Sequence, residues 1–253
     1  MSLVETDWLE KNISSVKIID CSWHMPQTKR NGLEEYKNQH IPNSIFFDLD
    51  ANSKKEINLP HMLVDQNEWE QIVSKMGINN EDEIIIYDNS DVISSCRCWF
   101  NFIYFGHNPK LVHVLNGGLK KWIKENNEVT KNIINIQPSN YKSFEKKELV
   151  KNKKSINQNI NEKKFKVIDA RSKERFEGKV QEPRKGLRSG SIKNSFCIPF
   201  DQCLNENKTF KSKENLKLIF ETCLENINEK NIVFSCGSGV TACVLALAYS
   251  LIN

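Results

Sequence analysis

The segment that decides the fold is Ile232–Leu251, which reads IVFSCGSGVTACVLALAYSL. Its first four residues form a short apolar run, which is typical of a parallel strand buried on both faces. Cys236 follows, glycines stand at positions 237 and 239, and an uncharged stretch of helical length begins near residue 240. This order of strand, glycine-rich turn and helix predicts an α/β domain with Cys236 at the end of a strand.

A related pattern occurs earlier in the chain, so the sequence contains an internal repeat. Val16–Asp20 (VKIID) is echoed by Phe165–Asp169 (FKVID), and Ile84–Asp88 (IIIYD) corresponds to Ile232–Cys236 (IVFSC). The period of roughly 150 residues is too long for a solenoid, whose repeats are much shorter. The sequence therefore predicts one α/β domain that occurs twice.

The elements of both copies follow from residue patterning. Strands are predicted at 16–21, 45–47, 84–88, 111–115, 165–170, 195–198 and 232–235. Helices are predicted at 6–13, 66–76, 96–105, 118–126, 213–225 and 240–251. We expect a first domain at 1–128, a polar linker at 129–143 that contains Pro138, and a second domain at 144–253. The charged stretch Lys146–Lys164 is expected to form a solvated helix and loop.

Composition excludes several classes of protein. The 253 residues are 39% hydrophobic and 27% charged, which is ordinary for a globular chain. The net charge of +4, from 36 basic and 32 acidic residues, is too balanced to suggest nucleic acid as a partner. No apolar run approaches ~18 residues and no signal-like segment opens the sequence, so we expect no membrane association. The eight cysteines are then expected to be reduced thiols in the cytoplasm.

The glycine-rich turn is the strongest candidate for chemistry. Glycines let successive N–H groups point inward, and the N-terminus of the following helix adds a positive partial charge. A cysteine at that focus is held as a thiolate nucleophile. Cys236 is thus the candidate nucleophile, stabilised by the loop Gly237, Ser238, Gly239, Val240 and Thr241. The alternative is that Cys236 is a small buried residue that merely closes a strand.

The segment Cys236–Cys243, CGSGVTAC, resembles the active-site loop of the two-domain rhodanese family, in particular its mercaptopyruvate-using members. The resemblance covers nearly the whole chain and includes FFDLD at 46–50, HML at 61–63, GGLKKW at 117–122 and RFEG at 175–178. It implies an α/β fold with two rhodanese-like domains in tandem, each a parallel sheet flanked by helices. It also implies a sulfurtransferase without cofactor or metal. Sulfur from 3-mercaptopyruvate would pass through a persulfide on Cys236 to a thiol or cyanide acceptor, releasing pyruvate.

The resemblance also assigns roles outside the loop. Arg175 and Arg184 match two arginines that hold the donor in the family, although alone they would be taken for surface residues. Asp50 and His61 match a pair that, with Ser238, forms a candidate proton relay; His61 is equally consistent with a residue that only orders its loop. A thiol such as thioredoxin or a small thiol is the acceptor that the family implies.

Competing functions remain open at this point. Thiosulfate-using relatives carry basic residues after the cysteine, where this chain has Gly237 and Ser238, so thiosulfate is the alternative donor. A cysteine phosphatase needs Cys-x5-Arg, but Ala242 stands at the sixth position after Cys236. A third alternative is a degenerate, non-catalytic binding protein. Asp88 takes the place of Cys236 in the first copy, which predicts that this copy is catalytically silent.

The end of the second copy differs from the first. In the first copy a strand and a tryptophan-containing helix at 111–122 follow the loop helix, whereas the second copy stops at Asn253. The second domain is therefore expected to be truncated at its C-terminus. The resemblance places the missing strand between 165–170 and 232–235, so we expect a gap in the second sheet there, with unpaired backbone groups.

Overall fold

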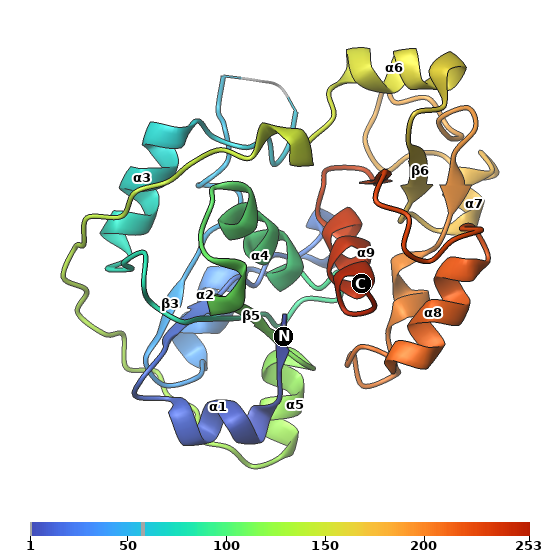
Figure 1. The fold of residues 1–253 in the computed structure, drawn as a ribbon. Helices are drawn as coiled ribbons and strands as arrows, with labels where there is room; N and C mark the ends of the chain where they lie inside the picture. Colours follow the sequence, from blue (N-terminus) through green and yellow to red (C-terminus); the bar gives the residue numbers. More distant parts are fainter. Residues whose placement is uncertain (1, 57–58) are drawn as a thin grey trace. The chain divides into compact units, whose positions relative to one another are not determined.

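The computed structural model describes residues 2–56 and 59–253, which form two compact units (Figure 1). The first comprises the chain up to Lys147 together with Asn207–Thr209, and the second comprises Glu148–Glu206 and Phe210–Asn253. Both are α/β units built on an all-parallel sheet, as the repeat predicts. Four short 3-10 helices accompany them, namely η1 (Pro26–Thr28), η2 (Pro109–Leu111), η3 (Lys147–Leu149) and η4 (Phe200–Cys203).

The first unit contains a five-stranded sheet in the order β1-β5-β4-β2-β3. Its strands are β1 (Leu3–Val4), β2 (Lys17–Asp20), β3 (Ser44–Phe46), β4 (Ile84–Tyr87) and β5 (Val112–Leu115). Ile18 in β2 lies opposite Ile85 in β4 and Ser44 in β3. β4 is central and all four of its residues are buried, which explains its uninterrupted apolar sequence.

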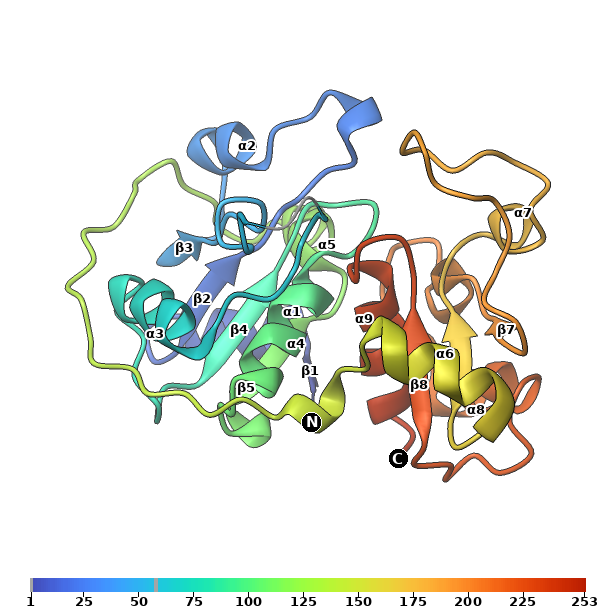
Figure 2. The same cartoon turned by 90° about the horizontal axis from the view of Figure 1, so that it is seen from above.

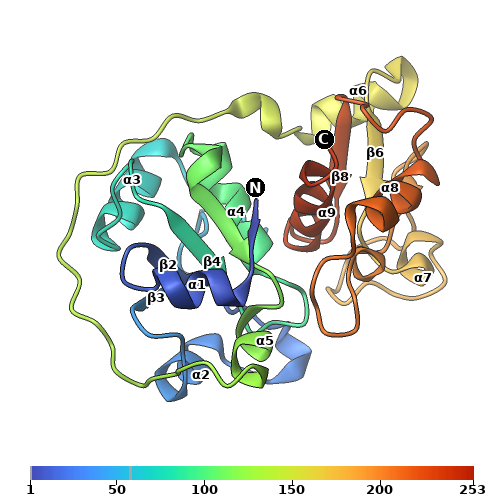
Figure 3. The same ribbon diagram turned by 60° about the horizontal axis from the view of Figure 1, so that its bottom comes forward.

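Helices cover both faces of this sheet (Figures 1 and 3). They are α1 (Thr6–Asn12), α2 (Gly32–Asn38), α3 (Gln66–Lys75), α4 (Ser95–Tyr104) and α5 (Gly118–Lys124). On one face, Ile85 packs with Leu9 of α1 and Trp122 of α5. Elsewhere in this unit Trp69 of α3 stacks on Phe105, with ring centroids 4.7 Å apart. Burial of these large apolar side chains is the main force that holds the layers together.

The predicted linker is an extended strap along the surface of the first unit (Figure 3). Its backbone is fixed there by several hydrogen bonds, including Thr130 N to His40 O at 2.9 Å and Ser139 N to Ser74 O at 2.9 Å. Tyr141 is fully buried and its hydroxyl lies 3.1 Å from His107 Nδ1. The polar sequence without periodicity thus gives an irregular segment that is nevertheless well anchored.

The second unit contains a three-stranded sheet in the order β7-β6-β8 (Figure 2). Its elements are α6 (Lys153–Glu162), β6 (Lys166–Asp169), α7 (Lys173–Phe176), β7 (Phe196–Cys197), α8 (Lys213–Glu221), β8 (Ile232–Ser235) and α9 (Thr241–Ser250). α9 packs against β8, α8 and η4, and six of its ten residues are buried. Tyr249 of α9 packs on Phe220 of α8 and donates its hydroxyl to Glu229 O at 2.7 Å.

The expected gap between the first strand of the second copy and the strand before Cys236 is wrong. β6 pairs directly with β8, with Lys166 opposite Ile232 and Asp169 opposite Ser235. The reason is visible in the first unit, where β5 adds to the outer side of β4 rather than between β2 and β4. Within the described residues, the outer side of β8 has no strand partner, and its four residues are only half-buried.

The bounds of the helices and strands lie close to those predicted from the sequence. The expected helices and strands are present with boundary shifts of a few residues, but β1, α2 and the single-turn helix α7 were not expected. β1 is only two residues long, too short for an alternating pattern, and α2 begins after Asn31, whose side chain accepts from Glu34 N. Within residues 2–56 and 59–253, no helix is long and apolar enough to cross a membrane.

Candidate active site

Cys236 lies at the carboxyl end of β8, immediately before the glycine-rich loop and α9. Its side chain is half-buried, and the N–H of Gly239 donates to Sγ at 3.1 Å. Gly239 has φ of 76°, a left-handed conformation that glycine adopts without steric cost. The loop therefore curls back over the sulfur, as the sequence predicts, and gives a negative sulfur a backbone donor beside a helix N-terminus.

The second thiol near the loop has a different environment. Cys243 is buried in the first turn of α9, and its Sγ donates to Gly239 O at 3.1 Å. This hydrogen bond connects the loop to the first turn of α9. Cys236 is the better-placed nucleophile, because it is partly accessible and its sulfur accepts rather than donates.

Arg175 and Arg184 both reach the residue that follows Cys236. Arg184 Nη2 donates to Gly237 O. Arg175 Nη2 lies 3.3 Å from the position that a Cβ on Gly237 would occupy, a distance tighter than ordinary contact. The absence of a side chain at Gly237 thus leaves room for a guanidinium beside the loop. Both predicted arginines are far from Cys236 in sequence, and the structure brings both of them next to Gly237.

Arg175 is fixed by Glu182, a carboxylate that is not among the predicted site residues. Glu182 accepts from Arg175 Nε at 3.1 Å and from Arg175 Nη2 at 2.6 Å, which is a bidentate ion pair. Its side chain is only 4% exposed. The Arg175 guanidinium holds the pKa of the Glu182 carboxyl below its usual range, with a further contribution from Arg171.

Arg171 completes this charged cluster. Its guanidinium pairs with Asp169 at 2.7 Å and with Glu182 at 2.9 Å, and Nη2 also donates to Gly190 O at 2.8 Å. Hydrogen bonding to Asp169 raises the pKa of Arg171, so this side chain stays charged. The sequence signal for the cluster was the acid–proline–arginine order of residues 182–184, in which Glu182 lies between two predicted donor-binding arginines.

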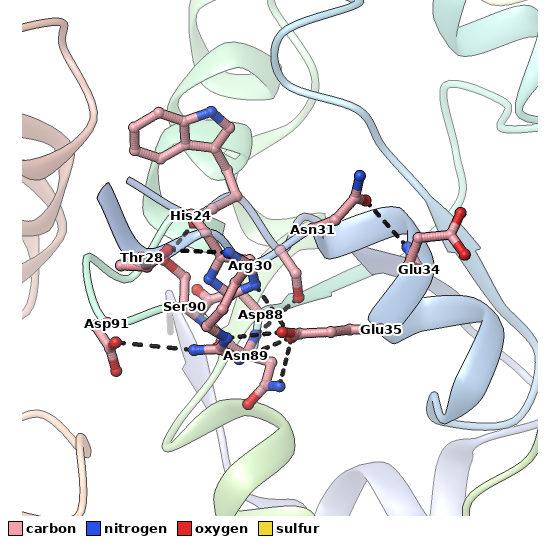
Figure 4. A network of polar contacts seen from close by, with 12 residues as sticks. His24, Thr28, Arg30, Asn31, Glu34, Glu35, Asp88, Asn89, Ser90 and Asp91 are labelled. Atoms are coloured by element: carbon pink, nitrogen blue, oxygen red, sulfur yellow. Dashed lines mark hydrogen bonds and ion pairs between the residues drawn. The ribbon is translucent and has the colours of Figure 1, made fainter. Parts of the chain in front are cut away.

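The matching position in the first unit has no nucleophile (Figure 4). Asp88 ends β4 where Cys236 ends β8, and it accepts from Ser90 N and from Ser95 N, both at 2.8 Å. Burial raises the pKa of the Asp88 carboxyl. A carboxylate cannot carry a sulfane sulfur, and this one is already engaged by two amides. The catalytic silence of this copy stays a prediction.

Arg30 in the first unit makes the same kind of contact that Arg184 makes in the second. Arg30 Nη2 donates to Asn89 O at 3.1 Å, just as Arg184 donates to the residue after Cys236. Arg30 is itself neutralised by Glu35, with two hydrogen bonds of 2.7 Å (Figure 4). Arg184, by contrast, forms no ion pair with any residue in the described ranges. Among the described residues, a carboxylate thus neutralises the cation at this place in the first unit but not in the second.

Asp50 and His61 are brought together in the first unit. His61 Nε2 lies 2.9 Å from Asp50 Oδ1, and Trp23 Nε1 donates to Asp50 Oδ2 at 2.9 Å. The hydrogen bond from His61 lowers the pKa of the Asp50 carboxyl. The backbone O of His61 accepts from Arg97, so the histidine also orders its loop. Ser238, the third member of the predicted relay, belongs to the loop of the second unit.

Metal binding receives no support from side-chain grouping. None of the eight cysteines forms a disulfide, and within residues 2–56 and 59–253 no group of three or more potential metal-ligating side chains occurs. The groups that the structure places at the candidate site are the Cys236 sulfur, a backbone N–H donor and two guanidinium groups.

Comparison with known proteins then decides the family. Residues 5–125 and 152–252 each match the Rhodanese-like domain. The chain belongs to the rhodanese family. Thiosulfate/3-mercaptopyruvate sulfurtransferase 1, mitochondrial, of Arabidopsis thaliana is 37% identical to it, over 97% of this chain and 70% of that protein. The thiosulfate sulfurtransferase of Rattus norvegicus is 33% identical, over 98% of this chain and 85% of that one.

Comparison with solved structures supports the same family. The crystal structure of SseA from Escherichia coli, described as a 3-mercaptopyruvate sulfotransferase, matches with a TM-score of 0.89 and 30% identity. The match covers 100% of this chain and 94% of that chain. The predicted fold of two rhodanese-like domains and the predicted enzyme class, sulfurtransferase, are both confirmed.

Proposed function

We propose that this sulfurtransferase accepts sulfur from 3-mercaptopyruvate on Cys236 and passes it to a thiol or cyanide. The observation that carries the proposal is the unpaired guanidinium of Arg184 beside a loop whose Gly239 N–H points at the Cys236 sulfur. A donor with one carboxylate and a transferable sulfur fits this pairing of a cation and a nucleophile.

The reaction then has two displacement steps. In the first, the Cys236 thiolate attacks the donor sulfur and forms an S–S bond. The electrons of the broken C–S bond go to the donor carbon, which takes up a proton, and pyruvate leaves. In the second, an acceptor thiolate or cyanide attacks the outer sulfur and Cys236 leaves as a thiolate. The Gly239 N–H faces the sulfur that is anionic at the start and at the end of the cycle.

The proton that the donor carbon needs is assigned to the relay of Asp50, His61 and Ser238. Support comes from the 2.9 Å contact between His61 and Asp50, which holds the imidazole in one orientation. A histidine near neutral pH is suited to exchanging that proton. Arg175 and Arg184 are proposed to hold the donor carboxylate, and thioredoxin or a small thiol is proposed as the acceptor.

Mass spectrometry tests the central step. The protein is incubated with 3-mercaptopyruvate, and the peptide that contains Cys236 is expected to gain ~32 Da, the mass of one sulfur atom in a persulfide. Cys236→Ser is expected to abolish both the adduct and turnover, because a serine hydroxyl stays protonated and cannot form a persulfide. Cys243→Ser is the matched control and should still be loaded. An adduct on Cys243 instead would contradict the assignment.

Thiosulfate is the second candidate donor. The rat relative is named for it, and the Arabidopsis relative is named for both donors. Neutral residues at Gly237 and Ser238 make the loop less suited to a dianion than to a carboxylate. The ratio of kcat/KM for the two donors distinguishes the two functions, and we expect it to favour mercaptopyruvate.

We also propose a cytoplasmic location, which is supported by eight cysteines that form no disulfide. A reducing compartment prevents such thiols from forming disulfides. The word mitochondrial belongs to the name of the Arabidopsis relative. Fractionation followed by immunoblotting checks the proposal: the protein should stay in the supernatant after organelles are pelleted, and recovery with the organelles would contradict it.

A further inference from the structure

Four charged side chains of the second unit are joined by ion pairs, a fifth contacts Gly237, which Arg175 also approaches, and the five charges do not cancel. They are Asp169, Arg171, Arg175, Glu182 and Arg184. Arg171 bridges the two carboxylates, and Arg175 connects Glu182 to the loop after Cys236. Three guanidinium groups against two carboxylates leave a net charge of about one, carried by Arg184.

The side chains of both carboxylates are almost completely buried. The side chains of Asp169 and Glu182 are each 4% exposed, so solvent screens their charges far less than those of surface acids. Both oxygens of Glu182 are used on Arg175, and one of them also accepts from Arg171. A single guanidinium therefore separates the Glu182 charge from Gly237, the neighbour of the nucleophile.

A sulfur-donor substrate interacts with the net charge of this cluster as well as with its individual N–H groups. One uncompensated positive charge suits a monoanion such as an α-keto acid with one carboxylate. A dianion such as thiosulfate brings a second negative charge, for which no unpaired guanidinium remains in the cluster. Without the Glu182 charge, the same three arginines would offer two uncompensated charges and would accept a dianion better.

We propose that Glu182 is a specificity-determining residue, which limits the positive charge beside Cys236 to one and thereby disfavours dianionic sulfur donors. This inference rests on the proposed function, because it concerns which donor loads Cys236. Glu182 acts through Arg175 and does not touch the reacting sulfur. Its second effect is to hold Arg175 in one orientation, and the experiment must separate charge from orientation.

The experiment compares kcat/KM for thiosulfate with kcat/KM for 3-mercaptopyruvate in four proteins: wild type, Glu182→Gln, Glu182→Asp and Glu177→Gln. Glutamine keeps the shape and one acceptor of Glu182 but removes the charge, whereas aspartate keeps the charge and shortens the side chain. Glu177 is exposed and pairs with Lys179, so Glu177→Gln makes the same change in overall charge outside the ion pairs of the cluster.

We expect Glu182→Gln to raise the thiosulfate-to-mercaptopyruvate ratio by roughly five- to thirtyfold, the effect of one unit charge across about 8 Å at an effective dielectric constant of about 20–40. Glu182→Asp and Glu177→Gln should leave the ratio within about twofold of wild type, because both keep the net charge of the cluster. High salt should shrink the effect of Glu182→Gln.

Several results would overturn the inference. If Glu182→Gln lowers kcat/KM for both donors equally, Glu182 only positions Arg175. If Glu182→Asp shifts the ratio as much as Glu182→Gln, geometry and not charge sets the preference. Should Glu182→Gln fail to fold, Asp169→Asn makes the same charge change from the other side of Arg171, and an unchanged ratio there refutes the charge argument. Failure of the wild type to be loaded by either donor refutes the proposed function instead.

Discussion

Replacement of Arg184 by alanine should impair donor binding without loss of stability. Arg184 is exposed, donates to Gly237 O, and forms no ion pair in the described part of the chain, so the fold depends little on its charge. Removal of the charged partner of a donor carboxylate costs about 2–3 kcal/mol, which is a fall in kcat/KM of roughly 30- to 150-fold. The change should appear mainly in KM, because the carboxylate is held equally in the ground state and the transition state.

Replacement of Arg175 by alanine, in contrast, should lower the stability of the fold. Its guanidinium is paired with the buried Glu182, so Arg175→Ala leaves that carboxylate with only Arg171 as a partner. We expect the free energy of unfolding to fall by about 1–3 kcal/mol, the cost of a buried group left short of hydrogen bonds. Arg184→Ala should change it by less than about 0.5 kcal/mol, as is usual for an exposed side chain.

The assay is the initial rate of pyruvate release from 3-mercaptopyruvate with a fixed thiol acceptor, alongside urea unfolding of each variant. Lys185→Ala is the matched control, since it removes an exposed positive charge next to Arg184 and should leave both measurements unchanged. Arg184→Lys should be intermediate, because lysine keeps the charge but not the two-pronged geometry. If kcat/KM of Arg184→Ala stays within threefold of wild type, the donor carboxylate is not bound at Arg184 and the reasoning fails.

Three further outcomes follow from the same structure. Replacing Gly237 and Ser238 by arginine and lysine should raise kcat/KM for thiosulfate and lower it for mercaptopyruvate, since it adds positive charge at the loop and crowds Arg175; unchanged donor preference would count against this. Because the folded-state pKa of Glu182 is lowered, its ion pairs stabilise the fold above the unfolded pKa of about 4.3, and that contribution is lost as the pH falls through the folded pKa. The difference in unfolding free energy between wild type and Glu182→Gln should therefore shrink in acid, and urea unfolding at pH 7 and pH 3 measures it. Amide hydrogens of β8 should exchange faster than those of β4, because β8 has one strand partner and half-buried residues while β4 is central and buried; equal rates by mass spectrometry would refute this.

The local sequence around Cys236 predicted most of the second unit's active loop. The apolar run, the two glycines and the apolar stretch each have a direct local consequence: a buried strand, a tight turn and a buried helix. The repeat of this pattern predicted two similar units, and Asp88 in place of Cys236 predicted which unit lacks the nucleophile. The predictions of the strand, the turn and the helix succeeded because they depend on residues that are neighbours in the chain, whereas the assignment of the nucleophile stays a prediction.

Strand order was harder to predict. The second sheet was expected to have a gap between its first strand and the strand before Cys236, where the resemblance placed the missing equivalent of β5, yet β6 pairs directly with β8 and β5 of the first unit lies on the outer side of β4. Alternation and length indicate that a segment is a strand, but they carry no information about which edge of a sheet it joins. β1 was missed for a related reason, since two residues become a strand only through pairing with β5.

The sequence by itself determined the α/β class, the duplication and the identity of the candidate nucleophile, because apolar periodicity and turn chemistry act over a few residues. Only the tertiary structure decided which charges meet. Glu182 and Arg171 come together with Arg175 because the segment between β6 and β7 folds back on itself, and Arg184 reaches Gly237 from 53 positions away in the chain. The charge beside Cys236 is therefore a property of the folded unit: side chains distant in sequence acquire a common electrostatic environment only when the backbone brings them within a few ångströms.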